Sequence, residues 1–218
     1  MRRAALVLAL ALIAGACGGG PELHGVVRSS PLEVGAIALP DVTEPALLAG
    51  GIVEDGRLVM RAGAEDRLLL VYFGFLNCPD VCPTTLMDLR SALARMDADE
   101  RDRVDLAFVT VDPDRDGPEE LAAYLRHIAP RHHAVRANPA ELTPAMDAFL
   151  ASAAIEVGED GRIEVAHTAV LYAVDATGRV VVEWPFGTGA TALADDLRVL
   201  LARVASAAST SASAGGRA

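Results

Sequence analysis

The sequence predicts an α/β domain with a central mixed sheet flanked by helices and an N-terminal β-hairpin. The segment LLLVYFGF (68–75) is continuously apolar, as a strand buried on both faces is, and VDLAFVTVD (104–112) is expected to be a second buried strand. Each precedes a segment with helical features. Two further strand candidates lie late in the chain, around the turn sequence DATG. Strands that alternate with helices early and end in an antiparallel pair are typical of such a mixed sheet.

The first predicted elements are a hairpin, a buried strand and a helix. GIVEDGRLVM (51–60) has two apolar runs around Asp55-Gly56, and an Asp-Gly pair is a strong signal for a tight hairpin turn. After the strand at 68–75, the segment PTTLMDLRSALARM (83–96) has apolar residues at helical spacing.

The remaining elements follow the second buried strand. GPEELAAYLRHI (117–128) opens with a proline and two glutamates, as a helix N-terminus should. LTPAMDAFLASA (142–153) is another helix candidate. Strands are expected in 162–175 and 179–186, and ALADDLRVLLARVA (192–205) closes the domain as an amphipathic helix. This order of elements matches a thioredoxin-like fold.

The N-terminal sequence predicts export. Two arginines precede an apolar run, Ala4 to Ala16, that is shorter than the about 20 residues of a membrane-spanning helix. IAGAC (13–17) resembles a bacterial lipobox, in which the cysteine becomes the lipidated first residue; ordinary cleavage after Ala16 is the alternative. We therefore expect residues 1–17 to be a signal peptide and the chain to be lipid-anchored at Cys17, on the extracytoplasmic face of the membrane.

Composition divides the rest of the chain. Residues 18–33 are rich in Gly, Pro and Ser and are expected to form a flexible tether, residues 34–204 the folded domain, and the low-complexity residues 205–218 a disordered tail. The net charge of −11 argues against nucleic-acid binding, because an acidic domain repels phosphate backbones.

Cys78 and Cys82 lie between the strand 68–75 and the helix that follows it. At this spacing both sulfurs can lie on one helix face, and we expect the positive helix end to lower their pKa values. A redox pair, a metal site and two core residues are the three interpretations. Prolines and Asp80 make the loop unlike a core segment, and its three-residue spacer is wider than that of C-x-x-C oxidoreductases. In an oxidising compartment such a pair forms a disulfide unless a reductant or metal protects it.

A metal site requires further ligands, and the chain has five histidines. His24 falls in the expected tether. His127, His132 and His133 are expected at the surface, at a helix end or in the following loop. His167 differs, because in a thioredoxin-like fold the loop before its strand faces the cysteine loop. Two thiolates and one imidazole suit copper, and a set of three protein ligands leaves room for ligand exchange.

Three segments resemble the signatures of the Sco/SenC family: VYFGFLNCPDVCPTTL, VTVDPDRDGPEELAAYL and VAHTAVLYAVDATGRVV. The resemblance covers roughly 66–204. The family consists of thioredoxin-like copper chaperones, tethered at a membrane surface, that help to assemble the copper centre of cytochrome c oxidase. The resemblance implies that Cys78, Cys82 and His167 bind a copper ion, Cu(I) or Cu(II). The segment 111–116 corresponds to one that lies near the metal loop in the family.

Within that segment, Asp112 and Asp114 are expected to be structural or to face a partner rather than to bind metal. The region RHHAVRANPAEL (131–142) replaces the family's usual loop, which bears on partner identity.

The resemblance implies a metallochaperone rather than an enzyme. Copper would pass by ligand exchange to the copper-receiving subunit of cytochrome c oxidase, with other copper chaperones or thiol reductants as further partners. The alternative is an extracytoplasmic thiol–disulfide oxidoreductase that keeps the oxidase cysteines reduced, in which His167 only tunes the thiol pKa values. A peroxidase related to peroxiredoxins is disfavoured, because no arginine identifies itself as the activator of a cysteine.

Overall fold

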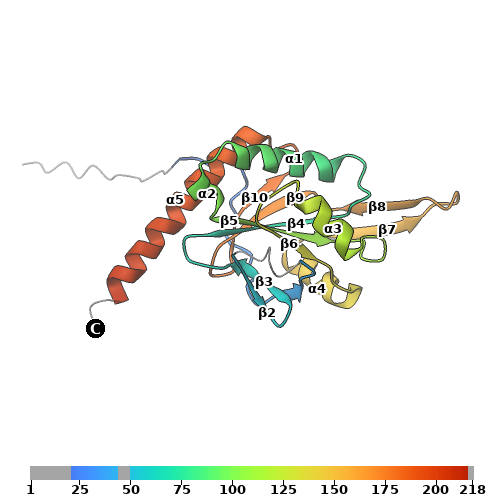
Figure 1. The fold of residues 1–218 in the computed structure, drawn as a ribbon, viewed down its shortest axis with the longest axis horizontal. Coiled ribbons are helices and arrows are strands. Elements are labelled where there is room, and N and C mark those ends of the chain that lie inside the picture. The colour runs from blue at the N-terminus through green and yellow to red at the C-terminus, as the bar shows by residue number, and fades with distance from the viewer. Residues whose placement is uncertain (1–20, 44–49, 216–218) are drawn as a thin grey trace, which may run out of the picture.

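A computed structural model describes residues 21–43 and 50–215, and its centre is a five-stranded mixed sheet (Figure 1). The signal peptide predicted at 1–17, with Cys17, lies outside the described residues. The strand order is β10-β9-β4-β5-β6, in which β4, β5, β6 and β10 run in one direction and β9 runs antiparallel to them. The strands are β4 (Leu68–Gly74), β5 (Val104–Thr110), β6 (His132–Val135), β9 (Val170–Val174) and β10 (Val180–Pro185). The predicted α/β fold with a central mixed sheet is confirmed.

Strands β4 and β5 are buried along their whole length, which explains their mainly apolar sequences; the buried Asp105 of β5 forms ion pairs with Arg67 and Arg131. Their side chains alternate between the two faces of the sheet. On one face the rings of Tyr72 and Phe108 lie 6.1 Å apart, and Phe108 contacts Tyr124 of α3. On the other, Phe73 packs against Phe149, at the end of α4. The helices are α1 (Val81–Ala94), α2 (Ala98–Arg101), α3 (Pro118–Leu125), α4 (Pro139–Ala148) and α5 (Ala190–Gly215).

The predicted N-terminal hairpin is confirmed as β2 (Gly51–Glu54) and β3 (Arg57–Ala62). Its turn residues Asp55 and Gly56 have φ angles of 50° and 73°, as a two-residue turn with both central residues in the left-handed region requires. A third strand, β1 (Ala38–Pro40), pairs with β3, so the hairpin belongs to a small sheet of its own.

The expectation of surface histidines after the second long helix is wrong for His132 and His133. Both are buried in β6, which pairs with β5 and forms an edge of the central sheet. His133 Nδ1 lies 2.7 Å from a carboxylate oxygen of Asp41, and both side chains are buried. The partner is distant in sequence and β6 has four residues, so local periodicity gave no sign of this strand.

The expected long strand at 162–175 is two strands. Its first part, β8 (Ile163–His167), leaves the central sheet and pairs with β7 (Ala153–Val157) as a two-stranded ribbon that projects from the body of the molecule (Figure 1). The helix expected at 142–153 ends earlier, at Ala148, because Leu150 adopts a positive φ of 53° that ends the helix.

The described part of the expected tether is bound to the domain. Val26 pairs with Glu183 of β10, and the backbone N–H of His24 donates to Asp196 of α5 at 2.9 Å. Farther along, the backbone N–H of Val42 donates to Ala134 in β6. The N-terminal segment therefore pairs with some backbone groups at both edges of the central sheet, which reduces the exposed strand edge. The prediction of a free tether is wrong for residues 21–33.

The C-terminal helix also differs from the prediction. α5 continues to Gly215, through most of the segment expected to be disordered. Alanine is the strongest helix former, so an Ala- and Ser-rich sequence can extend a helix that is already anchored by its first turns. Within the described ranges, no helix has both the length and the apolarity needed to cross a membrane.

Candidate metal centre

The cysteine loop connects the carboxyl end of β4 to the first turn of α1. Asp80 is the N-cap residue of α1, but its side chain makes no capping hydrogen bond. The backbone N–H of Cys82 donates instead to Cys78 Sγ, at 3.3 Å. The first N–H groups of a helix have no partner within the helix, and here the N–H of Cys82 donates to the sulfur of Cys78. The loop and the helix start thus place both sulfurs side by side.

His167 is 85 residues after Cys82 in the sequence, but the fold places it beside the two cysteines. It is the last residue of β8, just before β9, which runs antiparallel to β4 with Leu171 opposite Tyr72. The start of β9 therefore lies at the sheet edge where β4 ends. His167 Nε2 lies 3.2 Å from Cys82 Sγ, and the donor atoms of Cys78, Cys82 and His167 all lie within 4.8 Å of one another. In the described ranges, no other cluster of His, Cys, Asp or Glu side chains has this arrangement.

The orientation of His167 is set by its other ring nitrogen. Nδ1 lies 3.1 Å from the Thr168 carbonyl oxygen, to which it donates, so the lone pair is on Nε2 and faces Cys82. The rings of Tyr72 and Phe75 contact the imidazole edge-on, at centroid distances of 6.0 and 5.7 Å. Burial lowers the pKa of His167, which favours the neutral imidazole that binds metals.

The expected lowering of the thiol pKa values is wrong for Cys82. Burial, with a smaller contribution from its hydrogen bond with Cys78, raises the pKa of Cys82 to about 12. Desolvation therefore outweighs the helix end, and Cys82 is a thiol at neutral pH that can donate to His167 Nε2. Both cysteines are free thiols, and Cys78 is the more exposed of the two.

The sequence model of the SCO1/SenC family matches residues 51–202, which is well over half of the chain. The chain belongs to the SCO1/SenC family. A SCO2-like protein from Rickettsia conorii is 30% identical over 130 residues, which cover 59% of this chain and 63% of the relative. The chain thus spans less than two thirds of that relative's length.

Solved structures of SCO1/SenC relatives share the fold. Apo Sco1 from Thermus thermophilus is 27% identical and superposes with a TM-score of 0.65 over 84% of this chain and 99% of that one. ScoI from Bradyrhizobium japonicum, solved with copper bound, is 27% identical, with a TM-score of 0.58 over 78% of this chain and 96% of that one. The thioredoxin-like fold class is thereby confirmed.

Asp116 supports the cysteine loop of this SCO1/SenC domain. Its carboxylate accepts hydrogen bonds from the backbone N–H of Leu76 at 3.1 Å and from the Thr110 hydroxyl at 2.5 Å. The side chain is buried, and burial raises its pKa. Sequence reasoning placed it in the segment 111–116 without assigning it a role. The sequence feature that could have identified Asp116 is its position as the third aspartate after the buried strand β5.

The two neighbouring aspartates differ in exposure. Asp112 is buried and forms an ion pair with Arg115, which fits the structural role expected of it, whereas Asp114 is exposed. Neither belongs to the cluster of Cys78, Cys82 and His167.

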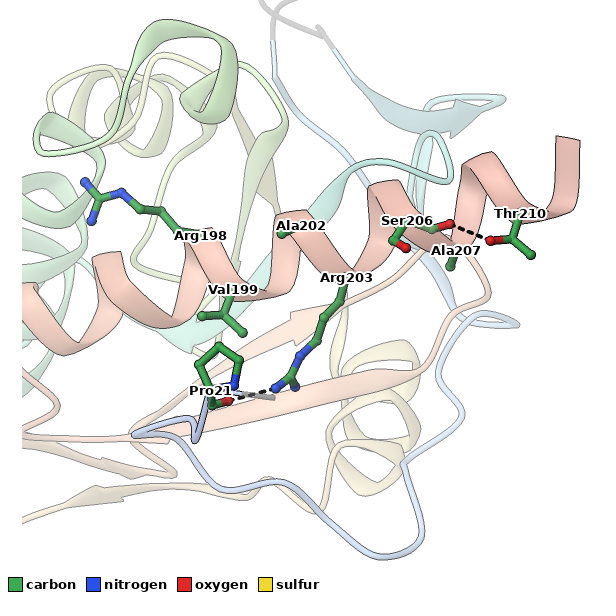
Figure 2. Close-up of a pocket in the computed structure, with 8 residues that line it drawn as sticks. All are labelled: Pro21, Arg198, Val199, Ala202, Arg203, Ser206, Ala207 and Thr210. Carbon is green, nitrogen blue, oxygen red and sulfur yellow. Dashed lines mark hydrogen bonds between the residues drawn. The ribbon is translucent and has the colours of Figure 1, made fainter. Parts of the chain in front are cut away.

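Two of the three donors, Cys78 and His167, border a pocket of about 290 Å³, and Cys82 is buried behind them. Its lining includes Cys78 and His167, with Asp80 at the loop and Val165 in the ribbon. A larger hollow of about 720 Å³ lies along α5, where Arg203 donates to the Pro21 carbonyl oxygen at 2.9 Å (Figure 2). That hollow is lined mainly by small side chains and two arginines and brings no nucleophile or metal-binding cluster together. The candidate metal ligands therefore lie at the smaller pocket.

Proposed function

We propose that the protein binds one copper ion through Cys78 Sγ, Cys82 Sγ and His167 Nε2 and delivers it to the copper-receiving subunit of cytochrome c oxidase. The observation that carries the proposal is the convergence of these three donors within 4.8 Å. Metal–sulfur bonds of about 2.3 Å in a trigonal site separate neighbouring donors by roughly 4 Å. Thiolates and imidazole are soft to intermediate ligands, a set that suits copper.

The number of protein ligands favours an ion that is carried and released over an ion that is a permanent part of the structure. Structural zinc sites are normally closed by four protein ligands, whereas the cluster in the described residues has three. Cys78 lines the pocket and is only half-buried, so an incoming ligand can approach the ion from its side. The reaction is an exchange of ligands without net turnover, so the protein acts as a metallochaperone rather than an enzyme.

Copper stoichiometry of the reduced protein tests the proposal. The unaltered protein is expected to bind one copper ion and, with Cu(II), to show a thiolate charge-transfer band. Cys78→Ala, Cys82→Ala and His167→Ala should each weaken binding and abolish or shift that band. His127→Ala is the matched control, because His127 is exposed and outside the cluster. Full copper affinity in Cys78→Ala would refute the proposal.

Thiol–disulfide exchange is the second candidate function, favoured by the proximity of two free thiols. Cys78 would be the attacking thiol, because it is the more exposed and its sulfur accepts a backbone N–H. Cys82, buried and with a pKa of about 12, would close the disulfide. His167→Ala distinguishes the candidates: it should keep reductase activity toward a model disulfide and lose copper binding.

We also propose that the protein is exported and lipid-anchored at Cys17. The supporting features are in the sequence: an apolar run too short to span a bilayer and the IAGAC segment before three glycines. The mass of the mature N-terminal peptide tests this proposal. A lipidated Cys17 is expected in the unaltered protein, and a Cys17→Ser variant should be released from membranes.

A further inference from the structure

The β7–β8 ribbon has two chemically different faces. In an antiparallel pair, residues directly opposite one another share a face, and successive residues alternate. The register Ala153↔His167, Ile155↔Val165 and Val157↔Ile163 therefore places five apolar side chains on the same face as His167. The other face has Glu156 directly opposite Glu164. The ribbon thus has an apolar face that ends at a candidate copper ligand, and an acidic face behind it.

The apolar face is exposed in the described structure. Val157 is 70% exposed, Ile155 49% and Ile163 42%. Neighbouring apolar side chains that form a contiguous exposed patch usually mark a surface that another molecule covers. The three lie on adjacent rungs of the ribbon and so form one patch rather than scattered residues. The ribbon projects from the domain, so nothing in the described ranges packs against this outer part (Figure 1).

The patch is continuous with the copper pocket. Val165 lies between Ile163 and His167 on the same face, is half-buried, and lines the pocket together with His167 and Cys78. A protein that covers the patch would therefore also cover the mouth of the pocket. Ligand exchange needs this proximity, because the incoming thiolates must come within bonding distance of the ion.

The acidic side chains of the ribbon indicate which charge the partner's surface should have around its apolar patch. Between Glu156 and Glu164 the chain has four carboxylates and one arginine, and Arg162 is paired with Asp160. Glu156 and Glu164 have no ion pair in the described ranges, although like charges opposite each other on a ribbon are destabilising. A partner with arginine or lysine beside an apolar patch would neutralise them.

We propose that the apolar face of the β7–β8 ribbon is the docking surface for the protein that receives copper, a partner with an apolar patch beside its copper-accepting thiols and basic side chains at the rim. The inference rests on the proposed copper-delivery function and names where its partner binds. During transfer, two Cu–S bonds to Cys78 and Cys82 and the bond to His167 break as bonds to the partner's ligands form. The partner's thiols release their protons, the two cysteines regain them, and the oxidation state of copper is unchanged.

Transfer to two acceptors tests the docking surface. The reduced, Cu(I)-loaded protein is mixed either with the soluble copper-binding domain of the oxidase subunit from the same cell or with bathocuproine disulfonate, a small chelator. The test variant is Val157→Ser/Ile163→Ser, the outermost rung of the ribbon. Val27→Ser is the matched control, because Val27 is 59% exposed but lies on the segment beside β10. Circular dichroism and the melting temperature check the fold of both variants.

The double variant should transfer copper to the protein acceptor at least about tenfold more slowly, since it removes two apolar side chains that the partner would bury. Its copper affinity and its transfer rate to the chelator should stay within about twofold of the unaltered protein. Glu156→Gln/Glu164→Gln should give a smaller reduction and a weaker dependence of the rate on salt. Val27→Ser should change none of these rates.

The outcomes separate the two proposals. Absence of copper binding in the unaltered protein would refute the proposed function itself. Normal binding with equal transfer to the protein acceptor by the double variant would overturn the docking surface only. Equal slowing toward both acceptors would also overturn it, because the change would act through the copper centre. A dimer that the double variant dissolves, with transfer unchanged, would assign the face to a second copy and likewise overturn the proposal.

Discussion

Two histidines, His167 and His133, lie on strands, and each is fixed by a hydrogen bond from one ring nitrogen. His167 is held by a backbone carbonyl oxygen, and its other nitrogen faces a sulfur beside an open pocket. His133 is bound by the buried carboxylate of Asp41. The comparison shows that a histidine on a strand is available as a ligand where its free nitrogen meets other donors and an entry path. Where it meets a buried carboxylate, it stabilises the fold.

The largest effect is expected from His133→Ala. The substitution removes the partner of Asp41 Oδ2 and leaves the buried carboxylate with only its hydrogen bonds from Thr43, and loss of one member of a buried pair typically costs about 3–5 kcal/mol. Denaturant unfolding should show this loss, whereas the copper affinity of the folded protein should be unchanged. A weaker copper site in His133→Ala, with little change in stability, would reverse the roles assigned to the two histidines.

His167→Ala should show the opposite pattern. Loss of even an outer partner of a metal ligand costs 10–100-fold in affinity, so removal of a ligand should cost at least about 100-fold. The half-buried side chain leaves room for solvent, so the free energy of unfolding of the apo protein should change by less than in His133→Ala. Competition against a chelator of known affinity measures the first quantity, and urea unfolding of the apo protein the second.

Copper affinity should rise with pH. The pKa of Cys82 is about 12, so at neutral pH the thiol must lose its proton when copper binds, and affinity should increase about tenfold per pH unit for this proton. The pKa of His167 is lowered by burial, so competition by its proton should begin only below its ordinary value of 6.5. Chelator competition between pH 6 and 9 measures the slope. An affinity independent of pH would contradict the protonated state of Cys82.

The smallest effect is expected from Tyr72→Phe. The Tyr72 hydroxyl is buried and has no hydrogen-bond partner in the described ranges, while its ring contacts His167. Removal of the hydroxyl keeps the ring and should raise the free energy of unfolding by about 1 kcal/mol. Copper affinity should not change. A loss of stability would show that the hydroxyl is bound through water or through Cys82.

Sequence reasoning succeeded where the signal was local. The buried strands β4 and β5, the turn at Asp55-Gly56 and the position of the cysteine pair follow from short patterns. The approach of His167 to the cysteines required a further premise, the order of strands in a thioredoxin-like sheet, and the geometry agrees with it.

The failures concern pairings between distant segments. β6 and β7 are stabilised by neighbours in space, and their own sequences are too short to show a period. The binding of residues 21–33 to β10 depends on backbone groups, which composition does not report. The prediction of a lowered pKa for Cys82 failed for a related reason. The pKa is raised by burial, and burial depends on the assembled fold rather than on the local sequence.

The contact between Pro21 and α5 bears on how the molecule is presented to its surroundings. Arg203 binds the carbonyl oxygen of Pro21, which is four positions after Cys17 in the sequence. For a chain anchored at Cys17, the connection between the anchor and Pro21 can be at most about 14 Å long. The far end of α5 and the β7–β8 ribbon lie at opposite ends of the long axis (Figure 1). If the chain is anchored at Cys17, so short a connection would keep the part of α5 that contacts Pro21 near the lipid and would leave the ribbon to point away from it.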